Sequence, residues 1–445
     1  MHETITLIKS GQTRKARDLL LESNVVDIAE FFDTLEGADL IVLFRILPKD
    51  VAADVFSYMD IDGQKYLVEK MSDEEIAGIL KELYMDDAVD FIEELPANVV
   101  TKVLNNTTSE RRNMINRLLS YPEDSAGSIM TTEYVDLKQN LTVLQAIQRI
   151  KKIGFDRETI NTLYVINENR KLEGILEIRQ LILSPPDAII KDIMDTNYVY
   201  VQTTDDQEDV ANMFIKYGYI AMPVVDKEHR LVGIVTVDDI LSIIEEENEE
   251  DFAKMNALSP SDDTYMESSV FELAKKRIYW LLFLMVSATF TGIIIRRYEN
   301  VLSKVVILAS FIPMLMDTGG NAGSQASTLI IRGLALNELK TSDILKIVWK
   351  EFRIGCLVGV VLSLINLIRL YYIERVSFNI CLSVCGSLFV VVIISKMLGG
   401  SLPILAKKLK FDPAIMAGPL ITTMVDAFSL MIYFTLASEF VLKAR

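Results

Sequence analysis

The feature that most constrains this fold is a change in the polarity of the chain near residue 275. Residues 278–295 form a run of 18 residues without charge, the length of apolar helix that spans a bilayer core. Because the hydrocarbon contains no water to satisfy open backbone groups, such segments cross it as helices. The sequence therefore predicts a five-span α-helical membrane domain over residues 275–445. The other apolar runs are residues 305–331, 354–368, 380–394 and 415–441.

The residues before the membrane domain form a strongly acidic body. Residues 1–274 contain 26 Lys and Arg against 53 Asp and Glu, and residues 275–445 contain 19 against 9. Such a body repels nucleic acid and attracts cations, although a well-solvated surface is the simpler explanation. Two histidines, His2 and His229, leave a zinc enzyme almost without ligands. With no nucleophile–base pair or phosphate-binding loop in the sequence, we expect no enzymatic activity.

An internal repeat organises the first part of the chain. Residues 27–48 align without a gap on residues 75–96, at an offset of 48, and each copy ends in Leu-Pro. Apolar positions recur at helical spacing, and each proline marks the end of one helix and the start of the next. The pattern predicts an α-helical, superhelical N-domain over residues 1–123. Its second copy carries Asp86, Asp87 and Asp90, which alone indicate only the solvated face of a helix.

A second repeat, of a different type, fills residues 124–244. Each copy contains an Ile-Met pair, a helix, two short β-branched strands and a closing helix, which is a β-α-β-β-α unit. The closing segment from Gly233 to Asp239 resembles that of tandem cystathionine-β-synthase-type (CBS) domains. The resemblance implies an α/β pair that senses a ligand, often an adenine nucleotide. Helices are expected at residues 143–150 and 209–216, and strands at 163–166, 172–176, 222–226 and 231–235.

A carboxylate-rich stretch joins the CBS pair to the membrane domain. Residues 243–257 contain six Asp and Glu with few apolar residues, which predicts a charged connecting helix within residues 245–274. A solvated connector is the simple interpretation. Because so many close carboxylates repel one another unless cations lie among them, a regulatory cation site is the more specific hypothesis.

The distribution of Lys and Arg favours a cytosolic position for the acidic body. In that orientation the inner loops carry eleven Lys and Arg and the outer segments carry seven, in the sense of the positive-inside rule. An odd number of spans then places the C-terminus outside the cell membrane.

The second predicted span contains polar groups that a simple anchor would avoid. Gly319, Gly320 and Gly323 lie beside Asn321 and Gln325. Irregular backbone at membrane depth is tolerated only against protein or a water-filled cavity. Close helix packing explains the glycines but not the amides, so the segment favours a pore lining. Asp317, in the same segment, has no assigned role.

The last predicted span carries a carboxylate, Asp426, well inside its apolar run. An ionised carboxylate at that depth costs ~2.5–3.5 kcal/mol and normally faces a cavity, a cation or a basic partner. Pro419 can free carbonyls about one turn earlier. Thr422, Asp426 and Ser429 are spaced three and four residues apart and share one helical face. Together they offer hard oxygen ligands for a hard cation.

Magnesium is the cation that these groups suit well. Mg²⁺ dehydrates reluctantly and is bound through one or two carboxylates, with several waters retained. The two polar segments contain no thiol or imidazole, which argues against zinc or copper. The ligand types do not separate Mg²⁺ from Mn²⁺, Co²⁺ or Ca²⁺.

The segments at residues 313–328 and 412–426 resemble those of the MgtE family of magnesium channels and transporters, as does the order of the domains. The resemblance implies a homodimer in the lipid bilayer that takes up Mg²⁺, with a pore between the subunits lined by the second and fifth spans. Asp426 matches the pore carboxylate, and Asp412 matches an acidic residue at the cytosolic mouth. The expected pore metal site comprises Asp426, Thr422, Asn321, Gly319, Gly320 and Gln325.

The resemblance also implies gating by cytosolic Mg²⁺. The ion would bridge the N-domain, the CBS pair and the connecting (plug) helix, offset their repulsion and hold the pore closed. Two departures from the family pattern matter. Gly418 stands where some members have Asn before the pore proline, so that neutral ligand is missing from the expected pore. Ser242 stands where a plug carboxylate can occur, so fewer or weaker cytosolic sites are expected. The expected regulatory residues are Asp86, Asp87, Asp90, Asp206, Glu208, Asp239, Glu247, Glu250 and Asp251.

Two other functions stay open on the sequence. One is a transporter of broader divalent-cation range that includes Co²⁺ and Mn²⁺. The other is a membrane-anchored nucleotide sensor in which the CBS pair is the working part.

Overall fold

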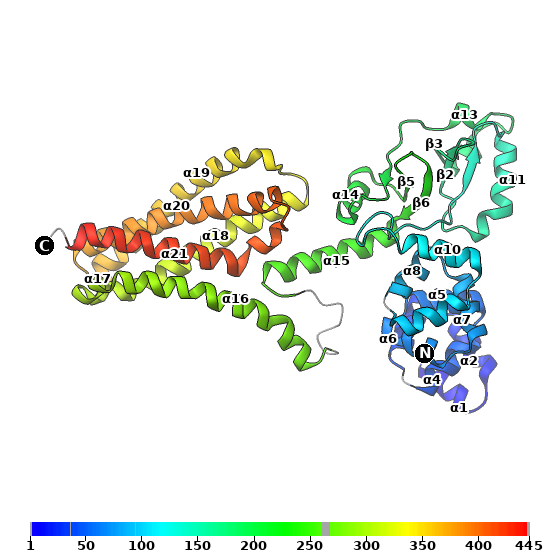
Figure 1. The fold of residues 1–445 in the computed structure, drawn as a ribbon, viewed down its shortest axis with the longest axis horizontal. Coiled ribbons are helices and arrows are strands. Elements are labelled where there is room, and N and C mark those ends of the chain that lie inside the picture. Colours follow the sequence, from blue (N-terminus) through cyan, green and yellow to red (C-terminus); the bar gives the residue numbers. More distant parts are fainter. Residues whose placement is uncertain (1, 36, 94, 260–267, 443–445) are drawn as a thin grey trace. The chain divides into compact units, whose positions relative to one another are not determined.

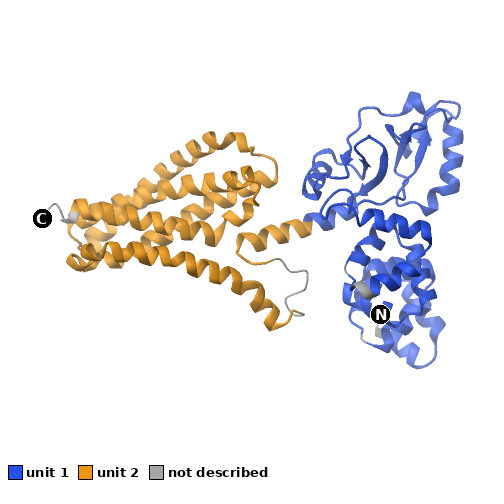
Figure 2. Cartoon of the chain, in the orientation of Figure 1, with its two compact units in different colours: residues 1–244 blue, residues 245–445 orange. Residues whose placement is uncertain are grey.

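A computed structural model of the chain describes residues 2–35, 37–93, 95–259 and 268–442. It divides into two compact units, residues 1–244 and residues 245–445 (Figure 2). The first unit holds the helical domain and the CBS pair, and the second holds the end of the connecting helix and the membrane helices (Figure 1). Residues 260–267 of the predicted connecting segment and residues 443–445 of the last predicted domain lie outside the described part.

The helical domain confirms the 48-residue repeat and extends it. Because α3 and α4 recur as α7 and α8, and α5 and α6 recur as α9 and α10 at the same offset, two four-helix units follow one another. The helices are α1 (His2–Lys9), α2 (Thr13–Leu21), α3 (Val25–Asp33), α4 (Ala38–Ile46), α5 (Lys49–Ser57), α6 (Ile61–Lys70), α7 (Asp73–Glu82), α8 (Met85–Glu93), α9 (Ala97–Asn105) and α10 (Ser109–Leu118).

Local signals explain where these helices begin and end. Pro48 and Pro96 are the N-cap residues of α5 and α9, as the Leu-Pro pairs predict. Ser72 and Glu75 form a reciprocal capping box at the start of α7, which satisfies two open backbone donors. The core includes Phe56, whose ring centroid lies 4.9 Å from that of Phe91 in an edge-to-face contact that joins the two repeat units.

The CBS pair consists of two three-stranded sheets of equal topology. In each sheet the first strand pairs parallel with the second, and the second pairs antiparallel with the third. The predicted β-α-β-β-α units are therefore confirmed. The elements are β1 (Asp136–Lys138), α11 (Val143–Ile153), β2 (Thr162–Ile166), β3 (Leu172–Glu177), α12 (Ile178–Leu183), α13 (Ile190–Ile193), β4 (Val201–Gln202), α14 (Gln207–Tyr217), β5 (Ala221–Val225), β6 (Leu231–Thr236) and α15 (Val237–Met255).

The two CBS repeats are joined reciprocally. Thr131, which follows the first Ile-Met pair, forms a β-bridge with Ile234 of the second sheet, and Asp195 forms one with Ile175 of the first. A Cβ at Gly233 would lie 2.6 Å from Met130 Sδ, so this close crossing requires glycine. Each repeat therefore completes the sheet edge of the other.

The connecting helix is part of α15 and does not form a separate element. The last CBS helix begins at Val237 and continues without a break to Met255, because Glu, Leu and Lys are good helix formers and the stretch contains no Gly or Pro. Within the predicted connecting segment at residues 245–274, α15 ends at Met255. The next helix of the described residues begins at Val270.

The second unit is a bundle of long helices joined by short turns (Figure 1). Helix α18 packs against α20 and α21, and α19 packs against α20. The elements are α16 (Val270–Arg297), α17 (Glu299–Lys304), η2 (Val306–Phe311), α18 (Ile312–Ala335), η3 (Thr341–Asp343), α19 (Ile344–Ile368), η4 (Arg369–Ile373), α20 (Phe378–Lys408), η5 (Pro413–Met416), α21 (Gly418–Ala437) and η6 (Ser438–Leu442).

Four helical segments of the described residues are long and apolar enough to cross a membrane: Val270–Arg297, Thr341–Ile373, Phe378–Lys408 and Pro413–Phe440. They correspond to four of the five predicted spans. Helix α18 has 24 residues and is about 36 Å long at 1.5 Å per residue, but its polar groups exclude it from this apolar class. The second predicted span, residues 305–331, stays a prediction.

Candidate pore and regulatory sites

A polar stripe follows one exposed face of α18. Asp317, Asn321 and Gln325 are exposed and succeed one another at intervals of four residues, so they lie one above the other. On the opposite face the helix is buried at Gly319, Gly320 and other small residues. The helix thus presents carboxylate and amide oxygens on the side that its own bundle does not cover.

The segment with the three glycines is a continuous helix. The irregular backbone considered for this span is therefore wrong. The glycines instead let α18 approach its neighbours: a Cβ at Gly319 would lie 2.8 Å from Val391 Cγ1, and one at Gly320 would lie 3.1 Å from Thr422 Cγ2. Close packing explains the glycines, as the simpler alternative proposed, while the amides remain exposed.

Helix α21 brings Asp426 alongside α18. Asp426 and Thr422 are half-buried, and the charge of Asp317 acts on the Asp426 carboxylate. Ser429 is 1% exposed, and its hydroxyl has no hydrogen-bond partner among the described residues. The three predicted residues of this face thus lie at the seam between α18 and α21, with Asp317 as an additional carboxylate.

Pro419 has a different role from the one its position in the sequence suggested. It lies in the first turn of α21, where a proline fits without loss of a helical hydrogen bond. Its carbonyl accepts hydrogen bonds from the hydroxyls of Thr422 (2.9 Å) and Thr423 (2.8 Å). The expectation that Pro419 frees a helical carbonyl one turn earlier is therefore wrong, because Pro419 lies at the start of the helix.

Lys396 is a buried charged residue beside this seam. In the sequence it follows the apolar run of residues 380–394, at the apparent end of a span. In the structure it lies in the middle of α20, a helix of 31 residues, and is 6% exposed. Its Nζ donates a hydrogen bond of 3.1 Å to Gln325 Oε1. Lys396 also lines a hollow of about 700 Å³ with Asn321, Ser324, Gln325, Thr328 and Leu329. No periodicity in the sequence pairs residues 325 and 396.

The predicted pore-mouth residue, Asp412, contacts the end of the connecting helix. Lys254 Nζ lies 2.7 Å from Asp412 Oδ2 and 2.6 Å from Glu250 Oε1. Burial, followed by the charge of Asp412, raises the pKa of Asp251 to about 6. The structure thus brings the predicted regulatory residues Glu250 and Asp251 to the predicted mouth, where Lys254 links the two segments.

The structure explains why glycine occupies position 418, where some members of the family have Asn. Its φ is +41°, in the left-handed region that disfavours a side chain, and a Cβ there would collide with the carbonyl oxygen of Met255. Met255 also packs against Ala414 and Ala417. The end of α15 therefore rests directly on the backbone at the start of α21.

A second acidic site lies within the first unit, where the helical domain meets the CBS pair. Asp86 is 6% exposed; burial and then the charge of Asp239 hold its pKa well above the ordinary range. Burial, followed by Asp239, raises the pKa of Asp87 to about 7. Burial raises the pKa of Asp239 to about 6, although a hydrogen bond from the Thr236 hydroxyl opposes the shift. The predicted residues Asp86, Asp87 and Asp239 are thus electrostatic neighbours.

Glu158 belongs to the same cluster and was not predicted. Burial, followed by the charges of Asp239 and Asp87, raises its pKa to about 8. It lies in the loop after the short helix η1 (Gly154–Asp156) and has no motif around it. Only the fold brings this loop to α8, so the sequence carried no signal for it.

The remaining predicted regulatory residues lie on three helices, α8, α14 and α15. Asp206 is the N-cap of α14, where its carboxylate accepts a hydrogen bond of 3.0 Å from the Glu208 amide. Glu247 lies on α15 and Asp90 on α8. Among the residues described, no three or more His, Cys, Asp or Glu side chains are placed to hold one metal ion. The acidic clusters therefore have the ligand type that Mg²⁺ prefers without a closed coordination shell, and the assignments stay predictions.

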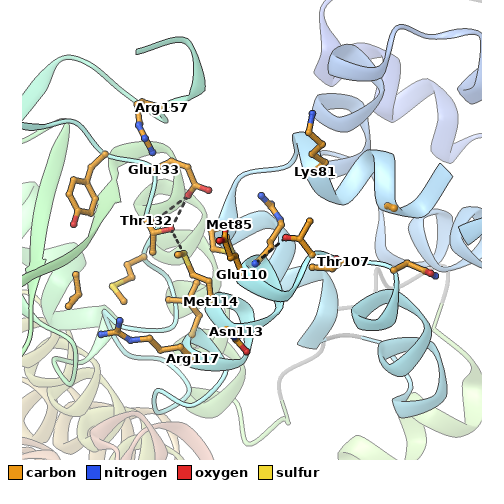
Figure 3. A pocket seen from close by; sticks show the side chains of 18 of the residues that line it. Lys81, Met85, Thr107, Glu110, Asn113, Met114, Arg117, Thr132, Glu133 and Arg157 are labelled. Carbon is orange, nitrogen blue, oxygen red and sulfur yellow. Dashed lines mark hydrogen bonds between the residues drawn. The ribbon is translucent and has the colours of Figure 1, made fainter. Parts of the chain in front are cut away.

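A basic pocket contrasts with the acidic surroundings (Figure 3). It has a volume of about 860 Å³ and lies between α7, α8 and α10 and the first CBS repeat. The Nε atoms of Arg111 and Arg157 are buried without a hydrogen-bond partner in the described structure. In Figure 3, Arg157 and Glu133 lie on the CBS side, and Lys81 projects from α7. The charged residues of its wall are Lys81, Arg111, Arg117, Arg157, Arg170, Glu110 and Glu133.

These features together define a membrane protein with an acidic body and a polar, carboxylate-bearing seam among apolar helices, which is the organisation of a cation transporter. Comparison with known proteins agrees. Residues 23–124 match the MgtE intracellular N domain, residues 126–185 and 190–246 match CBS domains, and residues 312–436 match MgtE, described as a divalent cation transporter. The chain belongs to the MgtE family.

Full-length relatives support this membership. The chain is 35% identical over 435 residues to the magnesium transporter MgtE of Thermus thermophilus, covering 97% of this chain and 96% of the relative. It is 34% identical to the Bacillus subtilis magnesium transporter MgtE, over 95% of this chain and 96% of the relative. The match thus extends over every domain described above.

Two solved structures resemble the first unit. One is the cytosolic domain of the Mg²⁺ channel MgtE in complex with ATP, with 35% identity, a TM-score of 0.51, and coverage of 54% of this chain and 97% of that one. The other is the soluble part of a magnesium transporter, with 34% identity, a TM-score of 0.53, and coverage of 55% and 98%.

Proposed function

We propose that this protein carries Mg²⁺ into the cell as a homodimer in the cell membrane, with its acidic body in the cytosol and its C-terminus outside. Asp426 and Thr422, with the polar stripe of α18 that includes Asn321 and Gln325, line the path. The electrochemical gradient drives the flux, because the sequence contains no recognisable ATPase motif.

The observation that carries this proposal is Asp426 at the seam of α18 and α21. A carboxylate within an apolar bundle is costly unless a cation or water-filled path accompanies it. The exposed stripe of Asp317, Asn321 and Gln325 would be equally costly against lipid tails. A second copy of the chain that covers this face would shield both groups from lipid. The carboxylate and the stripe would then line a polar path between two subunits.

Gating follows from the two acidic sites. Burial is the main cause of the raised pKa values of Asp87, Asp239 and Glu158, and the charges of neighbouring carboxylates add to it. A divalent cation relieves such repulsion. At the other site α15 rests on the start of α21 through Lys254 and Met255. We infer that cytosolic Mg²⁺ holds the helical domain, the CBS pair and α15 together and keeps the path closed.

The test is growth of cells that lack their own Mg²⁺ uptake systems, at limiting Mg²⁺, with wild type or Asp426→Ala expressed at equal levels in the membrane. We expect wild type to restore growth and Asp426→Ala to fail, because the variant lacks the carboxylate of the path. Glu338→Gln, which changes an exposed acid in the same unit, is the matched control and should restore growth. Equal growth with Asp426→Ala would remove this carboxylate from the essential path.

A broader divalent-cation range is the nearest alternative, and the description of the matching family as a divalent cation transporter favours it. Uptake of Mg²⁺ in the presence of Co²⁺ or Mn²⁺ separates the two functions. Competition at equal concentrations would indicate the broader range, whereas undisturbed Mg²⁺ uptake would indicate selectivity for Mg²⁺.

Nucleotide sensing is a second candidate function, and it is compatible with transport. The solved cytosolic domain of a relative holds ATP, and the basic pocket offers five Lys and Arg side chains for phosphate groups. Binding of an adenine nucleotide to the full-length protein, by calorimetry, tests this function. Nucleotide binding without any cation flux would make the sensor the main function.

A further inference from the structure

A buried lysine at the side of the proposed path calls for a physical reason. Lys396 lies at the middle of an apolar helix, and its side chain is almost fully enclosed. A charged group at such a depth is costly, and a leucine or methionine would fill the same space without that cost. The ammonium group therefore carries a role that packing alone does not supply.

Two polar partners accompany Lys396 across three helices. On one side its Nζ donates to the Gln325 carboxamide of α18. On the other side Glu351 of α19 is 7% exposed and interacts electrostatically with the lysine. Glu351 is held in place by close packing, since a Cβ at Gly400 would lie 2.8 Å from its Cγ. A charged row thus runs from the outer helix α19 through α20 to the polar stripe of α18.

The lysine faces the same hollow as two predicted pore residues. Asn321 and Gln325 line this hollow of about 700 Å³ together with Lys396. Ser327, on the same stretch of α18, donates to the carbonyl of Met416, the last residue of η5 (2.8 Å). The hollow therefore lies beside the part of α18 that reaches the predicted mouth.

We propose that Lys396 is an electrostatic brake on cation passage: held at Gln325 on the wall of the hollow, its positive charge disfavours divalent cations there, and Glu351 partly offsets that charge. The inference rests on the proposed function, because the hollow must border the cation path. It assigns a rate- and valence-determining role to residues outside the predicted metal site.

The direction of the effect follows from Coulomb's law. A fixed positive charge opposes a divalent ion twice as strongly as a monovalent one at the same distance. Removal of Glu351 leaves the lysine charge uncompensated and strengthens the brake. Removal of Lys396 releases it, and the two changes have opposite signs, which a purely structural role would not produce.

The experiment measures initial Mg²⁺ flux of the full-length protein in vesicles that contain a fluorescent Mg²⁺ indicator. We expect Lys396→Gln to raise the flux by roughly an order of magnitude, Lys396→Arg to leave it near wild type, and Glu351→Gln to lower it. The double variant Lys396→Gln/Glu351→Gln should flux faster than Glu351→Gln alone. Lys408→Gln, an exposed lysine on the same helix, is the matched control and should have no effect.

The outcomes are distinguishable. Absence of flux in wild type would contradict the proposed transport function itself. Wild-type flux with an unchanged or reduced rate for well-folded Lys396→Gln would overturn the brake, and so would a decrease in both single variants. An increase of Mg²⁺ flux for Lys396→Gln, together with a decrease for Glu351→Gln, would support it.

Discussion

At the scale of single residues, burial decides how the acidic groups behave. Asp87, Asp239 and Glu158 belong to three segments far apart in sequence, and each has a pKa raised chiefly by burial. The chain therefore keeps like charges together in a site that solvent does not screen. Such a site responds to any cation, proton or metal, that reduces the repulsion.

The first prediction is a loss of stability with rising pH in the absence of divalent cations. A carboxyl whose pKa is higher folded than unfolded binds more protons in the folded state, so the free energy of unfolding falls as pH rises between the two pKa values. For Asp87 and Glu158 the fall begins near pH 4 and is complete near pH 8. Calorimetry of the full-length protein in chelator should show the transition of the acidic body move to lower temperature across this range.

The Asp87→Asn variant isolates one of these groups. At pH 8 it lacks a buried charge, so we expect its transition about 2–4 °C above that of wild type, the equivalent of about 1 kcal/mol, and a smaller dependence on pH. Glu69→Gln, which changes an exposed acid on α6, should behave as wild type. A lower midpoint for Asp87→Asn at pH 8 would show that the carboxylate is satisfied in the folded state.

Individual site residues could be predicted where they belonged to a motif or placed a charge in an apolar segment. Asp426 stood out because a charge in an apolar run needs a reason, and the structure places it at a helix seam. Glu158 and Lys396 carried no such signal, because their partners, Asp87 and Gln325, lie about 70 residues away in each case. Contacts of that kind arise from tertiary packing, which periodicity does not encode.

At the scale of elements, sequence periodicity predicted the helices and strands well, whereas the irregular backbone expected from the glycines of α18 was wrong. The β-α-β-β-α units predicted helices and strands whose bounds agree closely with the structure, and the Leu-Pro pairs of the 48-residue repeat predicted where α5 and α9 begin. The glycine-rich stretch of α18 was expected to be irregular, yet tight contacts with α20 and α21 keep it helical. Glycines lower helix propensity, and in this bundle their packing gain is larger than that cost.

Helix α15 begins as the last CBS helix, and its second half, residues 245–255, belongs to the second unit. Its end is fixed to the start of α21 by the backbone contact of Met255 with Gly418 and by Lys254 between Glu250 and Asp412. The lysine offsets carboxylates that would otherwise repel one another. Lys254 is thus the cationic side chain that joins the end of α15 to the predicted mouth.

The second prediction concerns this lysine. In Lys254→Met the carboxylates of Glu250, Asp251 and Asp412 lose their countercharge, so α15 should separate from α21 more readily. We expect the cytosolic-side Mg²⁺ concentration that halves the flux to rise roughly threefold to fivefold, the equivalent of about 1 kcal/mol for a partly exposed ion pair. Flux into vesicles at graded Mg²⁺ on the cytosolic face measures it.

Lys254→Arg supplies the matched control for that measurement. It keeps the charge and the reach to both carboxylates, so half-inhibition should stay near the wild-type value. An unchanged Mg²⁺ dependence in Lys254→Met would mean that the contact of Met255 with Gly418 holds α15 without the ion pair.

At the scale of the whole molecule, two acidic sites in different units respond to the same ion in the proposed mechanism. One joins the helical domain to the CBS pair, and the other joins α15 to the membrane helices. The last CBS helix continues as α15 without a break, so in the proposed mechanism the two sites share one helix. By linkage, ions that bind at one site then favour the arrangement that binds them at the other.

The last prediction follows from this shared helix. Addition of Mg²⁺ to the full-length protein should slow amide hydrogen exchange in α8 and in the second half of α15 together, because both become held against their neighbours. In Asp87→Ala the ion has one ligand fewer at the first site, so protection of α15 should need more Mg²⁺ although residues 245–255 are unchanged. Glu69→Gln should match wild type in both segments. Protection of α15 at the wild-type Mg²⁺ concentration in Asp87→Ala would show that the two sites bind independently and that α15 is controlled only at its contact with α21.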